Sequence, residues 1–331
     1  MRPISYTRAT DVASAITTVS ADPERAFLAG GTTEIDLLRL NVVQPDGLVD
    51  INLLPLKQID VLADGGLRIG ALARMSDVAE APVVAEHFPM ITQALVLGAS
   101  PQLRHMASMG GNLMQRVRCS YFRDTHSPCN KREPGSGCAA LEGINRGHAI
   151  LGTSEQCIAT HPSDLAVALV ALDAIVHTEG PKGKRAIAID DFFLLPGDTP
   201  HREHPLDHGE LIVAIEVPAF PLARRSFYLK VRDRSSYEFA LVSVAMALRI
   251  DGGVISDVRL ALGGVATKPW RARRAEQILV GASAERASFV QAAREELAVA
   301  VPRRFNVFKV ELAERTIVRA LETATMMGGT A

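Results

Sequence analysis

The sequence predicts an α+β fold in two or three domains, and three observations support this class. The chain has 331 residues, which is enough for more than one hydrophobic core. No G-x-G-x-x-G fingerprint follows a predicted strand, so a Rossmann domain is not expected. Residues 221–331 predict a small antiparallel sheet covered by helices, which is an α+β unit.

The first predicted elements are a helix over residues 10–20 and a short apolar strand at 27–29. Thr10-Asp11 stands in capping position, and the apolar residues that follow recur at helical spacing. The strand runs directly into Gly30-Gly31-Thr32-Thr33, after which another helix begins. A strand, paired glycines, hydroxyl residues and a helix start form an arrangement in which backbone N–H groups can approach a phosphate. A glycine pair alone also fits an ordinary tight turn.

A second glycine pair occurs in the middle part of the chain. A strand at 48–51 and a hairpin turning at Asp64-Gly65-Gly66 come first, then a short helix that we expect Ser76-Asp77 to cap. After a helix at 88–97, residues 108–113 are predicted to form a polar loop around Gly110-Gly111. Two such segments, each beside a strand or helix edge, favour a phosphate-binding site formed jointly by both segments, hereafter the phosphate cradle.

Regular elements resume after residue 160. Ser163 is the expected N-cap of a helix in which Asp164 occupies the first turn. Strands are predicted at 174–177, 185–189 and 211–217, and a loop at 196–209. The later strands are predicted at 227–231, 240–250 and 254–262, and the later helices at 271–281, 284–299 and 306–325.

Composition excludes two classes of function. Net charge is −1, so no overall field attracts nucleic acid or an anionic membrane, and one Trp and four Tyr leave few rings for base stacking. No apolar run approaches the roughly 18 residues of a membrane span. We therefore expect neither nucleic-acid binding nor membrane insertion.

All four cysteines lie in one basic, irregular segment, residues 116–160. Structureless segments of this length are uncommon unless they are functional or disordered. Spacings of nine, eight and eighteen residues between Cys119, Cys129, Cys138 and Cys157 permit four thiolates to converge on an iron–sulfur cluster. Structural zinc usually shows tighter Cys pairs, and two disulfides or free thiols also remain open from the residues alone.

Together these stretches resemble the FAD-binding (medium) subunits of the molybdenum hydroxylases, the group of xanthine dehydrogenase and carbon monoxide dehydrogenase. The cysteine segment is an insertion that most members lack, and it is similar to that of the bacterial periplasmic aldehyde oxidoreductases, whose flavin subunit carries an additional [4Fe-4S] cluster. The motifs that carry the resemblance are Ala29-Gly30-Gly31-Thr32-Thr33, Ile69-Gly70-Ala71, Ala99-Ser100-Pro101-Gln102-Leu103-Arg104, Ser108-Met109-Gly110-Gly111-Asn112-Leu113, His161-Pro162-Ser163-Asp164, Lys230-Val231-Arg232 with Tyr237, and Gly263-Gly264-Val265-Ala266.

The resemblance implies two FAD-binding subdomains, residues 1–55 and 56–220, the second containing the iron–sulfur loop at 116–160, and a C-terminal α+β domain at 221–331. It assigns the FAD pyrophosphate to the two glycine segments, the ribose side to Asp164, and the flavin to Ile212 and Lys230. Few fixed cations are expected near the glycine segments, so backbone N–H groups are expected to do most of the phosphate binding. The implied FAD residues are Phe27, Leu28, Ala29, Gly30, Gly31, Thr32, Thr33, Glu34, Ile35, Ser108, Met109, Gly110, Gly111, Asn112, Asp164, Ile212 and Lys230, and the implied cluster ligands are Cys119, Cys129, Cys138 and Cys157.

The expected function is that of an electron-transfer subunit with no catalytic residue of its own for substrate oxidation. The resemblance implies a heterotrimer with a molybdenum-cofactor large subunit, which oxidises an aldehyde, and a small subunit with [2Fe-2S] centres. Electrons would reach FAD and then an external acceptor. The alternative is a flavin-dependent oxidoreductase that acts alone on a small molecule.

The N-terminal residues give an expectation about the compartment. Residues 1–30 contain no continuous apolar core of signal-peptide length. The chain is therefore expected to be cytoplasmic, or periplasmic if it is exported together with a partner that carries a signal.

Overall fold

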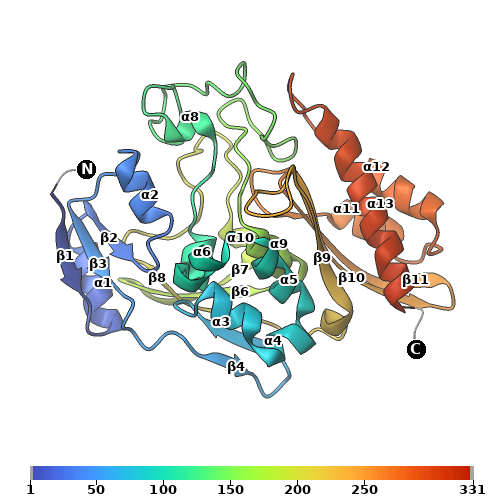
Figure 1. Ribbon diagram of the computed structural model, residues 1–331, viewed down its shortest axis with the longest axis horizontal. Coiled ribbons are helices and arrows are strands. Elements are labelled where there is room, and N and C mark those ends of the chain that lie inside the picture. Colours follow the sequence, from blue (N-terminus) through green and yellow to red (C-terminus); the bar gives the residue numbers. More distant parts are fainter. Residues whose placement is uncertain (1–2, 329–331) are drawn as a thin grey trace.

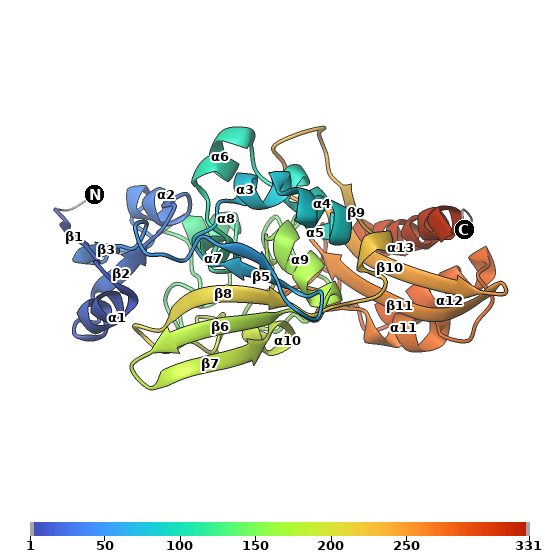
Figure 2. The ribbon, with the colours of Figure 1, turned by 90° about the horizontal axis from the view of Figure 1, so that it is seen from below.

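The computed structural model describes residues 3–328, which form three sheets that follow one another in chain order along the molecule (Figures 1 and 2). The sheets use residues 5–50, 59–217 and 226–271, and helices pack on all three. The predicted α+β class is confirmed, while the proposed positions of the domain boundaries stay a prediction.

The first sheet has three parallel strands, with β3 between β1 and β2. The predicted cap of the first helix is confirmed, because Asp11 Oδ1 accepts the Ser14 N–H at 2.7 Å. Strand β1 was not predicted, since all four of its residues are exposed and lack apolar alternation. The elements are β1 (Ser5–Arg8), α1 (Val12–Ser20), β2 (Arg25–Leu28), α2 (Glu34–Arg39) and β3 (Gly47–Asp50).

Asp50 holds the end of this sheet together. Its carboxylate accepts hydrogen bonds from the Tyr6 hydroxyl at 2.5 Å, the Asn52 N–H at 2.9 Å and Arg8 Nε at 3.2 Å. Burial acts to raise the pKa of Asp50, but these donors hold it at about 2, below its usual 3.8. The carboxylate therefore stabilises the fold above pH 3.8, and this stabilisation is lost as the pH falls through about 2.

Asp50→Asn should lower the free energy of unfolding at neutral pH by about 1–3 kcal/mol, because an amide cannot replace an ionised acceptor of four donors, the fourth being Asn52 Nδ2 at 2.7 Å. It should also flatten the pH dependence of stability between pH 3.8 and about 2. Urea unfolding of wild type and variant at several pH values measures both effects. Equal stability at neutral pH would contradict this role of Asp50.

The central sheet has five antiparallel strands in the order β4-β5-β8-β6-β7. Helices α3, α5 and α9 lie over one face of it (Figure 2). The predicted hairpin at Asp64-Gly65-Gly66, the strand at 211–217 and the Ser163 cap are confirmed. The strands are β4 (Ile59–Val61), β5 (Leu67–Gly70), β6 (Ile175–Gly180), β7 (Gly183–Ala188) and β8 (Leu211–Val217). The helices are α3 (Met75–Glu80), α4 (Pro82–His87), α5 (Pro89–Leu97), α6 (Pro101–Met106), α7 (Met109–Leu113), α9 (Asp164–Ala171) and α10 (Ile189–Phe192).

Two local predictions in this part were wrong. Ser76 and Asp77 do not cap α3 but lie inside its first turn. No side chain among the described residues caps this helix, and the N–H of its first residue, Met75, donates to the carbonyl of Ala107. Residues 108–113 are not a loop. The Ser108 hydroxyl accepts the Gly111 N–H at 3.2 Å and starts the short helix α7, so the second glycine pair is helical.

The cysteine-bearing segment, hereafter the cysteine loop, joins α7 to α9 and contains only one helical turn, α8 (Ser120–Arg123). It projects beyond the central sheet, beside the C-terminal helices (Figure 1). Asn306 and Lys309 hold it from that side, through the carbonyls of His148, Ala149 and Gly147. The irregular character predicted for this segment is confirmed.

The third sheet is antiparallel, in the order β12-β11-β10-β9, and three helices cover it. Its long hairpin and its helices lie where the sequence predicted them, within a few residues at each end. The elements are η1 (Ala223–Arg225), β9 (Ser226–Val231), β10 (Val242–Asp251), β11 (Val254–Gly263), β12 (Trp270–Arg271), α11 (Arg273–Leu279), α12 (Arg286–Leu297) and α13 (Phe308–Gly328).

Among residues 3–328, no helix combines the length and the apolar character needed to cross a lipid bilayer.

Candidate functional site

The two glycine segments lie against each other. A Cβ on Gly30 would stand 2.0 Å from the carbonyl oxygen of Met106, two residues before Ser108, so only glycine permits this approach. Gly31 has a φ of +72°, a conformation that side chains disfavour. The sequence-predicted cradle therefore exists as one contact between two distant parts of the chain.

Two cavities open on either side of this contact. One, of about 420 Å³, is lined by Ile212 and called the Ile212 cavity; the other, of about 540 Å³, is lined by Lys230 and called the Lys230 cavity. Both are lined by Thr32, Thr33 and Gly111, the residues of the glycine segments. The cavities thus share a wall at the predicted phosphate cradle, and together they form one long groove.

Most predicted FAD residues border this groove, but not all do. Phe27, Ala29, Gly30, Gly31, Glu34, Ser108, Gly110 and Ile212 line the Ile212 cavity, whereas Asn112, Asp164 and Lys230 line the Lys230 cavity. Leu28, Ile35 and Met109 line neither cavity, and Met109 is completely buried in the core. The structure does not bring Ile212 and Lys230 together, since they border opposite ends of the groove.

Asp164 and Lys230 form a buried ion pair in the Lys230 cavity. Lys230 Nζ lies 2.7 Å from Asp164 Oδ2, and the Tyr228 hydroxyl donates to Asp164 Oδ1 at 2.7 Å. Burial raises the pKa of Asp164, and the Lys230 ammonium opposes this shift. Asn112 is held nearby by the Ser163 hydroxyl, which donates to Asn112 Oδ1 at 2.5 Å. This end of the groove therefore offers fixed polar groups to a ligand.

The expectation of few cations at the glycine segments was wrong. Arg118 Nη2 donates to Thr33 Oγ1 at 3.3 Å, and both Arg118 and Arg123 border the Lys230 cavity. Arg116 lines the Ile212 cavity. All three arginines come from the cysteine loop, and nothing in their sequence pattern shows that this loop folds back onto residue 33.

The four cysteines gather in one place and are all free. Cys129 and Cys138 face each other across an antiparallel bridge. Burial raises the pKa of Cys119 to about 12, and Cys129 and Cys157 add to the shift. Burial also raises the pKa of Cys157, to which Cys138 and Cys129 contribute. The four thiols thus lie near one another in the fold, while their role as cluster ligands stays a prediction.

The positions of the sulfurs bear on the kind of metal group that would fit. Within residues 3–328, no three His, Cys, Asp or Glu side chains are disposed to hold a single metal ion. A zinc ion needs its ligands about 2.0–2.3 Å from one point. A four-iron cluster instead takes its thiolates at separate irons, which spreads the sulfurs over a larger volume. The described residues therefore show no preformed metal site, and the cluster stays a prediction.

Cationic and hydrogen-bonding groups surround the thiols. Lys131 is buried beside Cys157, and its ammonium acts to lower the pKa of that thiol. His148 Nε2 lies 3.1 Å from Cys119 Sγ, and burial lowers the pKa of His148 to about 4, so the ring is neutral near neutral pH. Lys131 Nζ also lies 3.1 Å from Glu203 Oε1, so its charge is shared between this carboxylate and the thiols.

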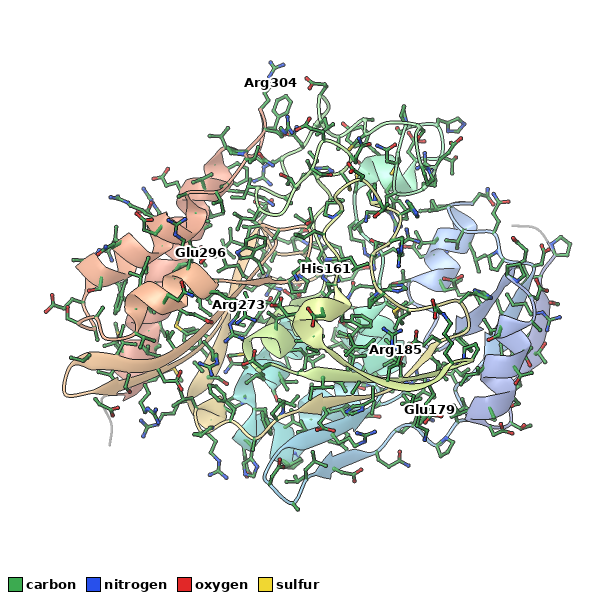
Figure 3. All side chains as sticks on the ribbon, turned by 180° about the vertical axis from the view of Figure 1, so that it is seen from behind. His161, Glu179, Arg185, Arg273, Glu296 and Arg304 are labelled. Carbon is green, nitrogen blue, oxygen red and sulfur yellow. The ribbon has the colours of Figure 1, made fainter. Side chains whose placement is uncertain are left out.

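A third cavity, of about 300 Å³, is lined by Cys119 and shares wall residues with the groove. Cys119 and His148 line it from the cysteine loop, and Asp164 lines both this cavity and the Lys230 cavity. His161, which also borders it, lies near the middle of the molecule (Figure 3). This cavity shares no wall residue with the Ile212 cavity, so Cys119 is linked to the Lys230 end of the groove.

Comparisons with known proteins cover nearly the whole chain. Residues 2–220 match the model of the FAD binding domain in molybdopterin dehydrogenase, and residues 227–324 match that of the CO dehydrogenase flavoprotein C-terminal domain. The chain is 49% identical to the aldehyde oxidoreductase FAD-binding subunit PaoB of Escherichia coli, over 98% of this chain and 99% of that one. It is 29% identical to the glyceraldehyde dehydrogenase medium chain of Sulfolobus acidocaldarius, over 84% and 81%.

Solved structures agree with these matches. A chain of carbon monoxide dehydrogenase from Hydrogenophaga pseudoflava superposes with a TM-score of 0.77 at 25% identity, covering 98% of both chains. A chain of quinoline 2-oxidoreductase from Pseudomonas putida gives the same TM-score at 23% identity, which shows the shared fold.

Proposed function

The chain belongs to the FAD-binding medium subunits of the molybdenum hydroxylases, and from this premise we propose that it is the electron-transfer subunit of a molybdenum-dependent aldehyde oxidoreductase, carrying both FAD and a [4Fe-4S] cluster. Its partners would be a large subunit with the molybdenum cofactor and a small subunit with [2Fe-2S] centres. The high identity to an aldehyde oxidoreductase subunit supports the substrate class, since the other relatives named above are more distant.

The observation that carries the proposal is the long groove divided by two glycine segments. Thr32, Thr33 and Gly111 at its middle would hold the pyrophosphate. We assign the flavin to the Lys230 cavity, because it holds the Asp164–Lys230 pair and shares a wall with the cavity of Cys119. The adenosine would then occupy the Ile212 cavity. Ile212 would contact the adenosine, whereas the resemblance assigned it to the flavin.

The cysteine loop would hold the cluster through Cys119, Cys129, Cys138 and Cys157. Their grouping, the burial of Cys129 and Cys157, and the neighbouring Lys131 support this assignment. When bound, FAD exchanges electrons singly or in pairs, which suits a position between one-electron clusters and an external acceptor. This chain's own residues would bind and orient the two groups, and the aldehyde would be oxidised on the molybdenum subunit.

The test uses two preparations of the full chain, one produced together with its partner subunits and one produced alone. We expect flavin absorption bands on a broad background that dithionite bleaches, together with iron bound to the chain. Added aldehyde should reduce the flavin only when the molybdenum subunit is present. Iron-free protein would reject the cluster, protein without flavin would reject the function, and aldehyde oxidation by the isolated chain would favour the stand-alone oxidoreductase.

A further inference from the structure

The arginines of the cysteine loop form a charged group at the FAD groove. Arg118 Nη1 lies 3.4 Å and Arg123 Nη2 lies 2.6 Å from the same atom, Asp36 Oδ2. Arg118 also donates from Nη2 to Thr33 Oγ1 at 3.3 Å. Two guanidinium groups thus share one carboxylate, and this trio carries a net positive charge.

Both guanidinium groups have a buried N–H without a partner. Arg118 Nε and Arg123 Nη1 are shielded from solvent, and neither has a hydrogen-bond partner within the described part of the chain. An unpaired buried donor costs free energy, so such groups are usually found where a ligand or water completes them. Both arginines line the Lys230 cavity beside Thr33 and Gly111. An anion in that part of the cavity would complete them.

We infer that Arg118, supported by Arg123, binds the diphosphate of FAD, so that the cysteine loop supplies the cation that the glycine segments lack. This inference rests on the proposed function, because it assumes FAD in the groove. Arg118 precedes Cys119 in the chain. Ligation of Cys119 would therefore also fix the backbone from which Arg118 reaches Thr33, and FAD retention would depend on an intact cysteine loop.

Arg118→Gln should weaken FAD binding by about 10- to 100-fold, the effect of losing a charge-assisted contact. The affinity is measured by quenching of flavin fluorescence as FAD is titrated into the deflavinated full-length chain produced with its partners. Binding of riboflavin, which has no phosphate, should change little. Arg274→Gln is the matched control. Arg274 pairs with Glu295 on the C-terminal helices, so this substitution removes the same charge at a place away from the groove.

Asp36→Asn should act in the opposite direction. It frees both arginines from their shared carboxylate and removes a negative charge from the cavity, so FAD should bind roughly 3- to 10-fold more tightly. Damage to the fold cannot imitate a gain in affinity. Iron per chain is measured in parallel, and unchanged iron in Arg118→Gln shows that the cysteine loop is intact.

The outcomes separate this inference from the proposed function. A wild-type chain that binds no FAD overturns both. If wild type binds FAD and Arg118→Gln binds it equally well, only the inference is overturned. A loss of riboflavin affinity as large as the loss of FAD affinity also overturns it, because the contact would then not be to phosphate.

Discussion

Replacement of Gly31 by Val should abolish FAD retention, with affinity reduced by more than about 100-fold. Gly31 has a φ of +72°, which a β-branched residue adopts only with strain. A Cβ there would also stand 3.2 Å from Ile35 Cγ1 and 3.4 Å from Leu28 Cδ1. The segment must move to accept the side chain, and Gly31 lines the Ile212 cavity of the groove. Flavin absorbance per purified chain measures the effect.

Gly65→Val is the matched control for this variant. Gly65 has a φ of +89° at the tip of the β4–β5 hairpin, where an added Cβ meets no atom within 4 Å. It therefore introduces the same kind of backbone strain, about 1–3 kcal/mol, without touching the groove. We expect Gly65→Val to retain FAD. Normal flavin content in Gly31→Val would remove the first glycine segment from the FAD site.

Local sequence signals predicted those elements whose cause lies within a few residues. The Asp11 capping box, the Asp64-Gly65-Gly66 turn and the Ser163 cap each depend on contacts no more than three residues apart. The 211–217 strand is a continuous apolar run buried in the central sheet. Such signals predict where elements start and end, and they were sufficient for the fold class.

What the sequence did not predict depends on contacts between distant residues. The exposed strand β1 exists because it pairs with β3, more than forty residues away in the chain, and its own residues carry no strand pattern. Arg118 reaches Thr33 across 85 residues, so its place in the candidate site follows only from the path of the cysteine loop. The separation of Ile212 from Lys230 likewise depends on how the second and third sheets meet.

Replacement of Cys129 by Ser should remove most of the iron from the chain and destabilise the cysteine loop. Cys129 is buried and packs in a small apolar cluster with Phe122 and Cys157. Its backbone N–H donates to Ser136 Oγ at 3.0 Å, a hydrogen bond that does not involve the replaced side chain. A serine hydroxyl is a poor substitute for a thiolate ligand, because soft sulfur ligands are those that iron–sulfur clusters select. Iron per chain and the broad visible absorbance report the loss.

Ser120→Ala tests whether any change in this loop would have the same effect. Ser120 follows Cys119 directly and its side chain is exposed, so the variant should keep its iron and its thermal midpoint.

Cys129→Ser also tests whether FAD binding depends on the cysteine loop. If the cysteine loop supplies the cation for FAD, flavin affinity should fall together with iron, although Cys129 lines neither cavity of the groove. Full iron content in Cys129→Ser would instead exclude Cys129 as a ligand, and the grouping of the four thiols would then need a different explanation.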